Sequence, residues 1–204
     1  MTQQRNFDAV ALQWDEEPRR VRLAGDIAAA MMDSIPFSKE WDALDFGCGT
    51  GLVTLQLAPY LRTITGADSS AGMLGRLNAK ILASALSNVQ AALCDPAKGG
   101  LPAGRFHLIT SAMTLHHVAD VASLIQSLKG LLHPGGWIAL ADLDAEDGSF
   151  HDDPTGVFHN GFSAEELSGA LEKAGFSSIA IKTATNIVKG DRIFPVLLAT
   201  AQSR

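Results

Sequence analysis

One short stretch constrains this chain more than any other. The sequence LDFGCGTGLV, at residues 44–53, follows one apolar run, opens another, and places three glycines at alternate positions. Gly47, Gly49 and Gly51 lack a β-carbon, which permits a tight turn and a close approach of the backbone to a ligand. Their G-x-G-x-G spacing departs from the dinucleotide fingerprint G-x-G-x-x-G, because position 52 is leucine. The stretch predicts a cofactor-binding turn between a strand and a helix, the alternative being an ordinary connection.

Strand-like and helix-like patterns alternate along the rest of the chain. We predict strands at residues 41–46, 63–68, 88–94, 106–113, 137–143, 178–188 and 193–201, and helices at 18–35, 51–61, 70–86, 121–132 and 163–176. This alternation predicts right-handed βαβ units and a doubly wound, Rossmann-like α/β sheet covered on both faces. The last two strands, which turn near residues 189–191, are expected to form an antiparallel hairpin at its edge. Ligands of such sheets bind at the carboxyl ends of the strands.

Composition and charge narrow the class of protein. The chain has 204 residues, of which 47% are hydrophobic and 19% charged, as suits one globular domain over residues 1–204. The net charge of -6 and the lack of a Lys/Arg run disfavour a nucleic-acid partner. Two cysteines without metal spacing, no signal-like N-terminus and no long apolar run favour a cytoplasmic protein with no membrane span.

Acidic residues at two strand ends extend the predicted site. Asp68 ends the second strand, 21 positions after Gly47, where a carboxylate can grip a ribose diol through two hydrogen bonds. The alternative is an acid placed at a helix N-terminus, which the helix dipole favours. Asp95 ends the third strand and is placed either to meet an adenine amino group or to start a turn before Pro96.

Several stretches occur together in a recognisable order. They are LDFGCGTG (44–51), GADSSAGML (66–74), LCDP (93–96), FHLITSAMTLHHVAD (106–120) and LLHPGGWIALAD (131–142). As a set they resemble a class I S-adenosylmethionine-dependent methyltransferase of the small-molecule type, over roughly residues 42–142. The resemblance implies a seven-stranded sheet of order 3-2-1-4-5-7-6 with a C-terminal hairpin. It also implies S-adenosyl-L-methionine as cofactor and S-adenosyl-L-homocysteine as product.

The resemblance carries roles onto individual residues. Asp45 organises the glycine turn near the methionine amino group, Asp68 holds the ribose hydroxyls, and Asp95 faces the adenine. The implied cofactor-binding residues are Trp14, Asp45, Gly47, Cys48, Gly49, Gly51, Asp68, Ser69, Met73, Cys94, Asp95, Ser111, Ala112 and Met113.

The N-terminal residues 7–20 resemble the lid that closes over the donor in small-molecule methyltransferases. In this interpretation Trp14 covers the cofactor, and Arg19 or Arg20 pairs with a carboxylate. The alternative is an amphipathic helix that packs on the sheet. We therefore divide the domain into a helical lid at residues 1–35 and a Rossmann-like core at residues 36–204.

Catalytic residues are harder to predict, because methyl transfer from a sulfonium mainly requires alignment of the nucleophile and exclusion of water. His116 and His117 follow the fourth strand and are candidate bases, unless they only shape the loop. His159 is a third candidate. It lies in the long connection 142–162, which precedes the next predicted helix.

The same connection holds the predicted substrate pocket, whose candidate residues are His151, His159 and Asp144. Histidines beside carboxylates also occur in metal sites, but the spacing fits no standard template, so no metal is predicted. A solvated acidic loop that lines a cleft with one or two histidines is the preferred interpretation.

The predicted function is transfer of a methyl group to a small-molecule acceptor, by a monomer or homodimer. A non-catalytic S-adenosylmethionine-binding protein is the main alternative. A nicotinamide-dependent oxidoreductase is less favoured, because Tyr60 is the only tyrosine and no Lys follows it at the fourth position, which is Ile64. The sequence does not choose between O, N, C and S acceptors.

Overall fold

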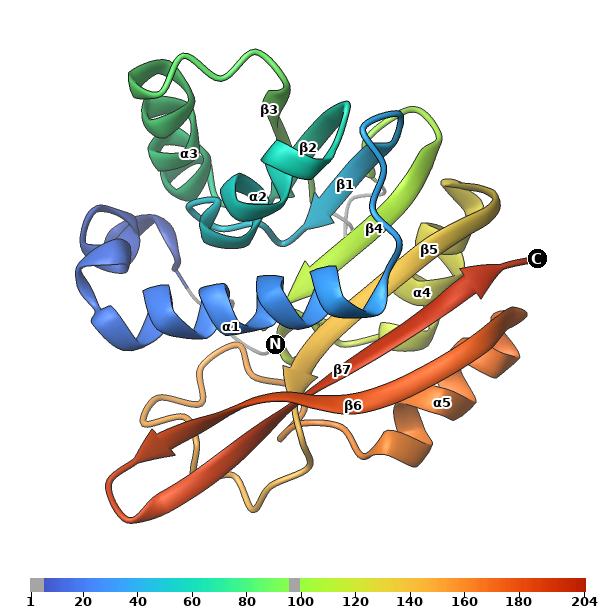
Figure 1. Cartoon of the computed structure of the whole chain (residues 1–204). Helices are drawn as coiled ribbons and strands as arrows, with labels where there is room; N and C mark the ends of the chain where they lie inside the picture. The colour runs from blue at the N-terminus through green and yellow to red at the C-terminus, as the bar shows by residue number, and fades with distance from the viewer. Residues whose placement is uncertain (1–5, 96–99) are drawn as a thin grey trace.

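A seven-stranded sheet of order β3-β2-β1-β4-β5-β7-β6 forms the centre of the structure (Figure 1). The computed structural model describes residues 6–95 and 100–204. The strands are β1 (Asp42–Phe46), β2 (Thr63–Asp68), β3 (Val89–Leu93), β4 (Phe106–Ala112), β5 (Leu132–Leu143), β6 (Phe176–Lys189) and β7 (Arg192–Ser203). The first five run parallel, and β7 is antiparallel to both β5 and β6. The predicted fold, strand order and terminal hairpin are confirmed.

Helices cover both faces of this sheet. The α-helices are α1 (Pro18–Ser34), α2 (Leu52–Leu57), α3 (Ala71–Ala83), α4 (Val121–Gly130) and α5 (Ala164–Lys173), and the short 3-10 helices are η1 (Asp8–Glu16), η2 (Ala58–Tyr60) and η4 (Leu115–His117). One apolar core lies beneath α1, α2 and α3, and a second lies beneath α4 and α5. Within residues 6–95 and 100–204, no helix is long and apolar enough to cross a membrane.

The N-terminal region divides into two parts with different roles. Five residues of α1 are buried, namely Ala24, Ile27, Ala28, Ala30 and Met31. Helix α1 crosses the front of the sheet as a structural layer (Figure 1). Only η1 and the first turns of α1 extend toward the carboxyl ends of the parallel strands.

Helix α2 gives way to η2 at Pro59, as expected of a proline that ends or bends a helix. The start of β5 differs from the sequence prediction. Strand β5 begins at Leu132, whereas the sequence predicts a strand from residue 137, so the sequence HPGG at residues 133–136 lies inside the strand. Its pairing with β4 shifts register between Phe106 and Leu108. Gly135, with a φ of +74°, lies in this irregular part of β5, where a residue other than glycine would be strained.

Side chains cap the N-termini of two helices. Ser163 and Glu166 form a reciprocal capping box at the start of α5. At the start of α3, the Ser70 hydroxyl accepts a hydrogen bond of 3.1 Å from the amide of Met73. The second cap fixes the turn that directly follows Asp68.

Candidate active site

The three glycines of the turn after β1 serve two different purposes. All three have left-handed backbones, with φ of +71° at Gly47, +54° at Gly49 and +84° at Gly51. A β-carbon at Gly47 would lie 2.3 Å from the Thr114 side chain, and one at Gly51 would lie 2.4 Å from Leu77. These two glycines therefore permit packing within the protein. At Gly49 a β-carbon would meet no atom within 4 Å, so the space for a ligand lies there.

The carboxylate of Asp68 ties the glycine turn to the end of β2. Its Oδ2 accepts a hydrogen bond of 2.8 Å from the amide of Gly49, and its Oδ1 accepts one of 2.8 Å from the amide of Ser70. Burial raises the pKa of Asp68, although these amides oppose the shift. Each carboxylate oxygen can accept a second hydrogen bond, so the group can still receive two ribose hydroxyls.

Asp45 performs a similar role beneath the turn. It is buried, its Oδ2 accepts from the Thr54 hydroxyl at 2.5 Å, and its Oδ1 accepts from the Thr110 hydroxyl at 2.9 Å. Burial raises the pKa of Asp45 to about 6, and the two threonine hydroxyls partly offset this shift. The side chain thereby joins β1 to α2 and β4 at the floor of the site.

A cavity of about 1000 Å³ opens above these residues. The predicted site residues that line it are Trp14, Asp45, Gly47, Cys48, Gly49, Asp68, Ser69, Met73, Cys94, Asp95, Ala112, Met113, His116, His117 and His151. Gly51, Ser111, Asp144 and His159 do not line it. Ser111 is buried, and its hydroxyl has no hydrogen-bond partner among the described residues. Pro96, predicted to follow Asp95 in a turn, lies outside the described residues.

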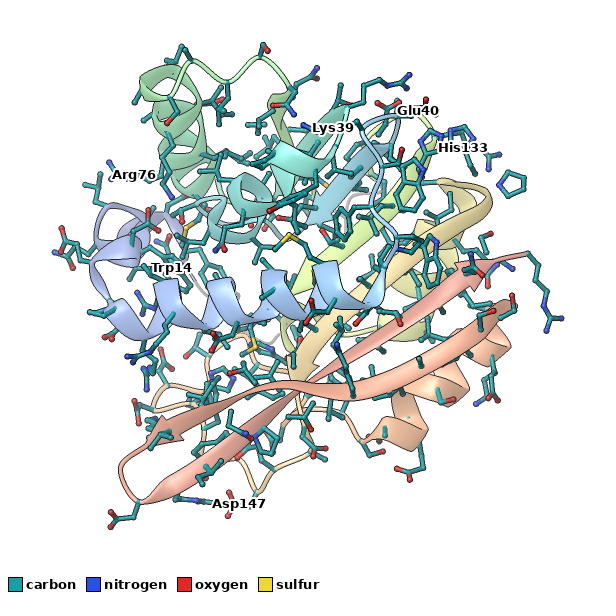
Figure 2. All side chains as sticks on the ribbon, in the orientation of Figure 1. Trp14, Lys39, Glu40, Arg76, His133 and Asp147 are labelled. Atoms are coloured by element: carbon teal, nitrogen blue, oxygen red, sulfur yellow. The ribbon has the colours of Figure 1, made fainter. Side chains whose placement is uncertain are left out.

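The segment η1 closes one side of this cavity and is anchored at both ends by carboxylates. Near its start, Asp8 Oδ1 accepts from the Ser70 hydroxyl at 2.5 Å and from the amide of Gly72 at 2.7 Å. Near its end, Asp15 accepts from the Thr50 hydroxyl and pairs with Lys80, both at 2.5 Å. Both anchors lie on the two turns that Asp68 joins. Trp14 lines the cavity between η1 and the body of the domain (Figure 2).

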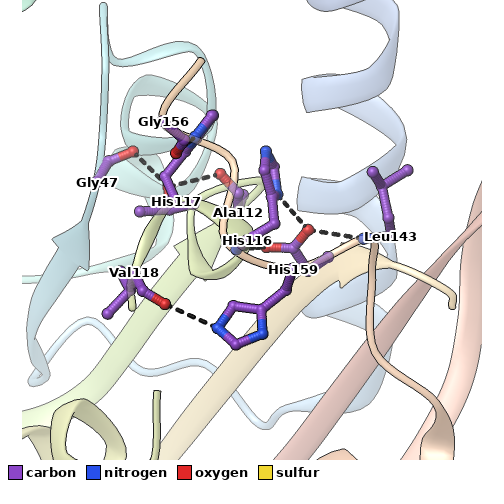
Figure 3. A network of polar contacts seen from close by, with 10 residues as sticks. Gly47, Ala112, His116, His117, Val118, Leu143, Gly156 and His159 are labelled. Atoms are coloured by element: carbon purple, nitrogen blue, oxygen red, sulfur yellow. Dashed lines mark hydrogen bonds and ion pairs between the residues drawn. The ribbon is translucent and has the colours of Figure 1, made fainter. Parts of the chain in front are cut away.

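A buried histidine–aspartate pair joins η4 to the end of β5, and His116 of this pair lines the cavity (Figure 3). Nδ1 of His116 lies 2.6 Å from Oδ1 of Asp142, and both side chains are almost fully enclosed by protein. Asp142 also accepts hydrogen bonds from the backbone amides of His116, at 3.3 Å, and of Leu143, at 2.8 Å. A ring that donates from Nδ1 to a carboxylate keeps, when neutral, a lone pair on Nε2.

Two further imidazoles approach His116. Nδ1 of His117 donates to the carbonyl of Gly156 at 2.7 Å, and its ring centre lies 4.2 Å from that of His116. The ring of His151 lies 4.9 Å from that of His116. The three rings form a cluster at the wall of the cavity. No group of three His, Cys, Asp or Glu side chains in residues 6–95 and 100–204 has an arrangement that could hold a metal ion.

The long connection after β5 is held against the β6–β7 hairpin by ion pairs. Asp147 pairs with Arg192 at 2.9 Å, and Asp152 pairs with Lys189 at 2.6 Å (Figure 2 labels Asp147). Phe150 packs edge-on to Phe194, with ring centres 5.2 Å apart. The acidic side chains of these two pairs are solvated, His151 lines the cavity, and the contacts to the hairpin lie beside that part of the loop.

His159 and Asp144 lie elsewhere in this connection. Nε2 of His159 donates to the carbonyl of Val118 at 3.0 Å, and its ring lies 5.0 Å from that of Phe162. Asp144 accepts from the amide of its neighbour Ala145. Both residues support the loop from outside the cavity, which differs from the predicted pocket positions.

Comparison with known proteins places the chain in a family. A family model described as a methyltransferase domain matches residues 6–181. The chain belongs to this methyltransferase domain family. The predicted resemblance to class I S-adenosylmethionine-dependent methyltransferases is confirmed.

Curated relatives of this methyltransferase domain come from distant organisms. An uncharacterised methyltransferase of Schizosaccharomyces pombe is 29% identical over 153 residues, a match that covers 68% of this chain and 54% of that protein. One of Synechocystis is 30% identical over 158 residues and is matched over 72% of each chain. The chain thus spans about half the length of some curated relatives.

Solved structures share the fold. The chain superposes on a SAM-dependent methyltransferase from Aquifex aeolicus with a TM-score of 0.71 and 20% identity, over 97% of this chain and 98% of that one. It superposes on phosphoethanolamine N-methyltransferase 2 of Haemonchus contortus, in complex with S-adenosyl-L-methionine, with a TM-score of 0.73 and 16% identity. That match covers 88% of this chain and 52% of the other.

The two kinds of glycine predict opposite phenotypes. Gly49→Ala should still fold, with a free energy of unfolding lower by about 1 kcal/mol because alanine disfavours the left-handed backbone. It should also weaken S-adenosylmethionine binding, because the added methyl group enters the cavity. Gly51→Ala should lose clearly more stability, because its β-carbon would meet Leu77. Denaturant unfolding and calorimetric titration of both variants measure the contrast, and equal ligand affinity of Gly49→Ala and wild type would contradict it.

The buried Asp45 predicts a pH-dependent stability. The folded protein keeps the carboxyl protonated up to about pH 6, whereas an unfolded chain loses the proton near the ordinary value of 3.8. The free energy of unfolding should therefore fall as the pH rises through this window. Asp45→Asn can keep contacts to Thr54 and Thr110 without titrating, so its stability should fall less. Urea unfolding of wild type and Asp45→Asn at several pH values measures this difference. If the free energy of unfolding changed with pH equally in both proteins, the titration of Asp45 would be excluded.

Proposed function

We propose that the chain transfers a methyl group from S-adenosyl-L-methionine to a small-molecule acceptor. The observation that carries the proposal is a single cavity that joins the glycine turn and Asp68 to the cluster of His116, His117 and His151. Its volume of about 1000 Å³ lies at the upper end for ligand sites, which suits two ligands side by side. The family model and the relatives named methyltransferase support the same activity.

The donor half lies at the carboxyl ends of β1, β2 and β3. Here Asp68 receives the ribose hydroxyls, the backbone at Gly49 approaches the donor, and Asp45 orients the turn. Met73 and Cys94 are buried cavity residues that would pack against the adenine ring, with Asp95 beside it. The open space at Gly49 is what a bound donor would fill.

The acceptor half lies between α1, η4 and the connection after β5. Its apolar lining comes from Leu23, Ile27, Phe150, Phe158 and Ile187. A small molecule with an apolar body fits such a lining better than a charged polymer does.

His116 is the proposed base. S-adenosylmethionine supplies an electrophilic methyl group on a sulfonium. His116 accepts the proton of the acceptor on Nε2, while Asp142 holds the ring orientation through Nδ1 and stabilises the imidazolium. His117 and His151 enclose the same space and help to exclude water.

Segment 8–16 is the proposed lid, in place of the whole of residues 1–35, because α1 belongs to the core. Its carboxylate anchors, Asp8 and Asp15, must release for the donor to enter beneath Trp14. The buried free thiols of Cys48 and Cys94 suit a reducing cytoplasmic location.

Calorimetric titration with S-adenosylmethionine, S-adenosylhomocysteine and NADH tests the donor class. We expect both sulfur ligands to bind and NADH to give no heat, because the turn lacks the dinucleotide spacing. Binding of NADH alone would overturn the proposal. Silence of all three ligands would do the same and would favour a member of the fold without donor binding.

Replacement of His116 tests the base. In His116→Asn the amide nitrogen takes the place of Nδ1 and can still donate to Asp142, but Nε2 is lost. We expect donor affinity to stay unchanged and turnover to fall by about 10²–10⁴-fold. His159→Asn is the control, and its turnover should stay close to that of wild type because His159 lies outside the cavity. Equal turnover of both variants would remove the base role.

A further inference from the structure

The cavity is lined by three permanent cations, and two of them are engaged by the protein. Arg20 places its guanidinium 3.9 Å from the ring centre of Trp14 and donates to the Trp14 carbonyl at 3.3 Å. Lys189 donates to the carbonyl of Phe150 at 2.8 Å and to Asp152 at 2.6 Å. These contacts shape the wall of the acceptor half.

Arg19 is the exception. Its side chain is half-buried at the cavity wall, and its guanidinium makes no hydrogen bond or ion pair with the described residues. Its positive charge contributes to the lowered pKa of Asp152, but the Oδ1 of that carboxylate is bound by Lys189. An arginine that half-enters a cavity with all of its donors unused is a ready partner for a ligand oxyanion.

Arg19 also stands where two cavities meet. A second cavity of about 170 Å³ lies between the start of α1 and the end of β6, and Arg19, Leu23 and Ile187 line both cavities. The smaller cavity adds Arg22 and the amide side chain of Asn186. Its single carboxylate, that of Asp26, already accepts from the hydroxyl of Thr185 at 2.8 Å.

One face of α1 supplies both a cationic and an apolar part of this wall. Arg19, Leu23 and Ile27 recur every fourth residue, so they form one stripe of the helix, and all three line the large cavity. Phe150 and Phe158 line the same cavity. A ligand that packs an aromatic ring against these apolar residues would extend its other end toward Arg19. The planar guanidinium of Arg19 can bind a carboxylate at that end through two parallel hydrogen bonds.

We propose that Arg19 binds the carboxylate of the acceptor, and that the acceptor is a hydroxyaryl carboxylate whose hydroxyl lies near His116. This inference rests on the proposed methyl transfer and names the substrate class for it. Asp152 and Asp153 also line the cavity and oppose an anion. Lys189 pairs with the first of these. Arg19 is the cavity-lining cation whose guanidinium makes no hydrogen bond or ion pair with the described residues, so its N–H donors are available to a ligand carboxylate.

The test measures binding to the protein saturated with S-adenosylhomocysteine, so that turnover is not required. The probes are para-hydroxybenzoate, para-hydroxyphenylacetate and para-hydroxyphenylpropanoate, each beside its neutral amide. We expect at least one carboxylate to bind about tenfold or more tightly than its amide, as for hydrogen bonds to a charged group. In Arg19→Gln the carboxylate should lose this advantage and the amide should bind as before.

Two matched variants sharpen the result. Lys173→Gln removes an exposed charge of α5 and should keep the preference, whereas Arg19→Lys keeps the charge without the fork and should keep only part of it. Equal binding of carboxylates and amides by wild type, an unchanged preference in Arg19→Gln, or no binding of any probe beside bound S-adenosylhomocysteine would overturn the inference. Failure of S-adenosylhomocysteine itself to bind would instead refute the proposed function.

Discussion

The hydrogen bonds of Asp68 hold the donor side of this structure together. One carboxylate bridges the amide of Gly49, in the turn after β1, and the amide of Ser70, in the turn after β2. The anchors of η1 then attach to the same two turns, since Asp8 binds the Ser70 hydroxyl and Asp15 binds the Thr50 hydroxyl. Three segments that are distant in sequence thereby share one polar network. A ligand that binds Asp68 would therefore be connected to η1 through one or two hydrogen bonds.

The sequence predicts the local features of this arrangement well and its long-range pairings poorly. Turn residues and apolar periodicity are local signals, and they identify most strands and helices and the glycine turn, whereas the strand order follows from the family resemblance. They do not show that Gly47 and Gly51 make room for Thr114 and Leu77, because those contacts depend on how the strands are arranged. The pair of His116 and Asp142 is absent from the predicted site for the same reason.

Separation along the chain is the physical limit in each of these cases. Asp142 lies 26 residues after His116, at the end of β5, and reaches it only because β4 and β5 pair in parallel. The sequence indicates a solvated acidic loop after β5, but it does not show the ion pairs of this loop with Lys189 and Arg192, which lie in the β6–β7 hairpin. Composition gives its charge and cannot show which partner neutralises it.

The two halves of the cavity are built in different ways, and this explains why one is easier to interpret than the other. Strand ends and a glycine turn form the proposed donor half, and their residue types suit the shape of a cofactor that the family shares. Helix α1, η4 and the loop after β5 form the proposed acceptor half, where insertions and substitutions can change the ligand without disturbing the sheet. The family can therefore establish the donor chemistry, whereas the acceptor must be read from uncompensated groups such as Arg19 and from the lone pair that Asp142 secures on His116.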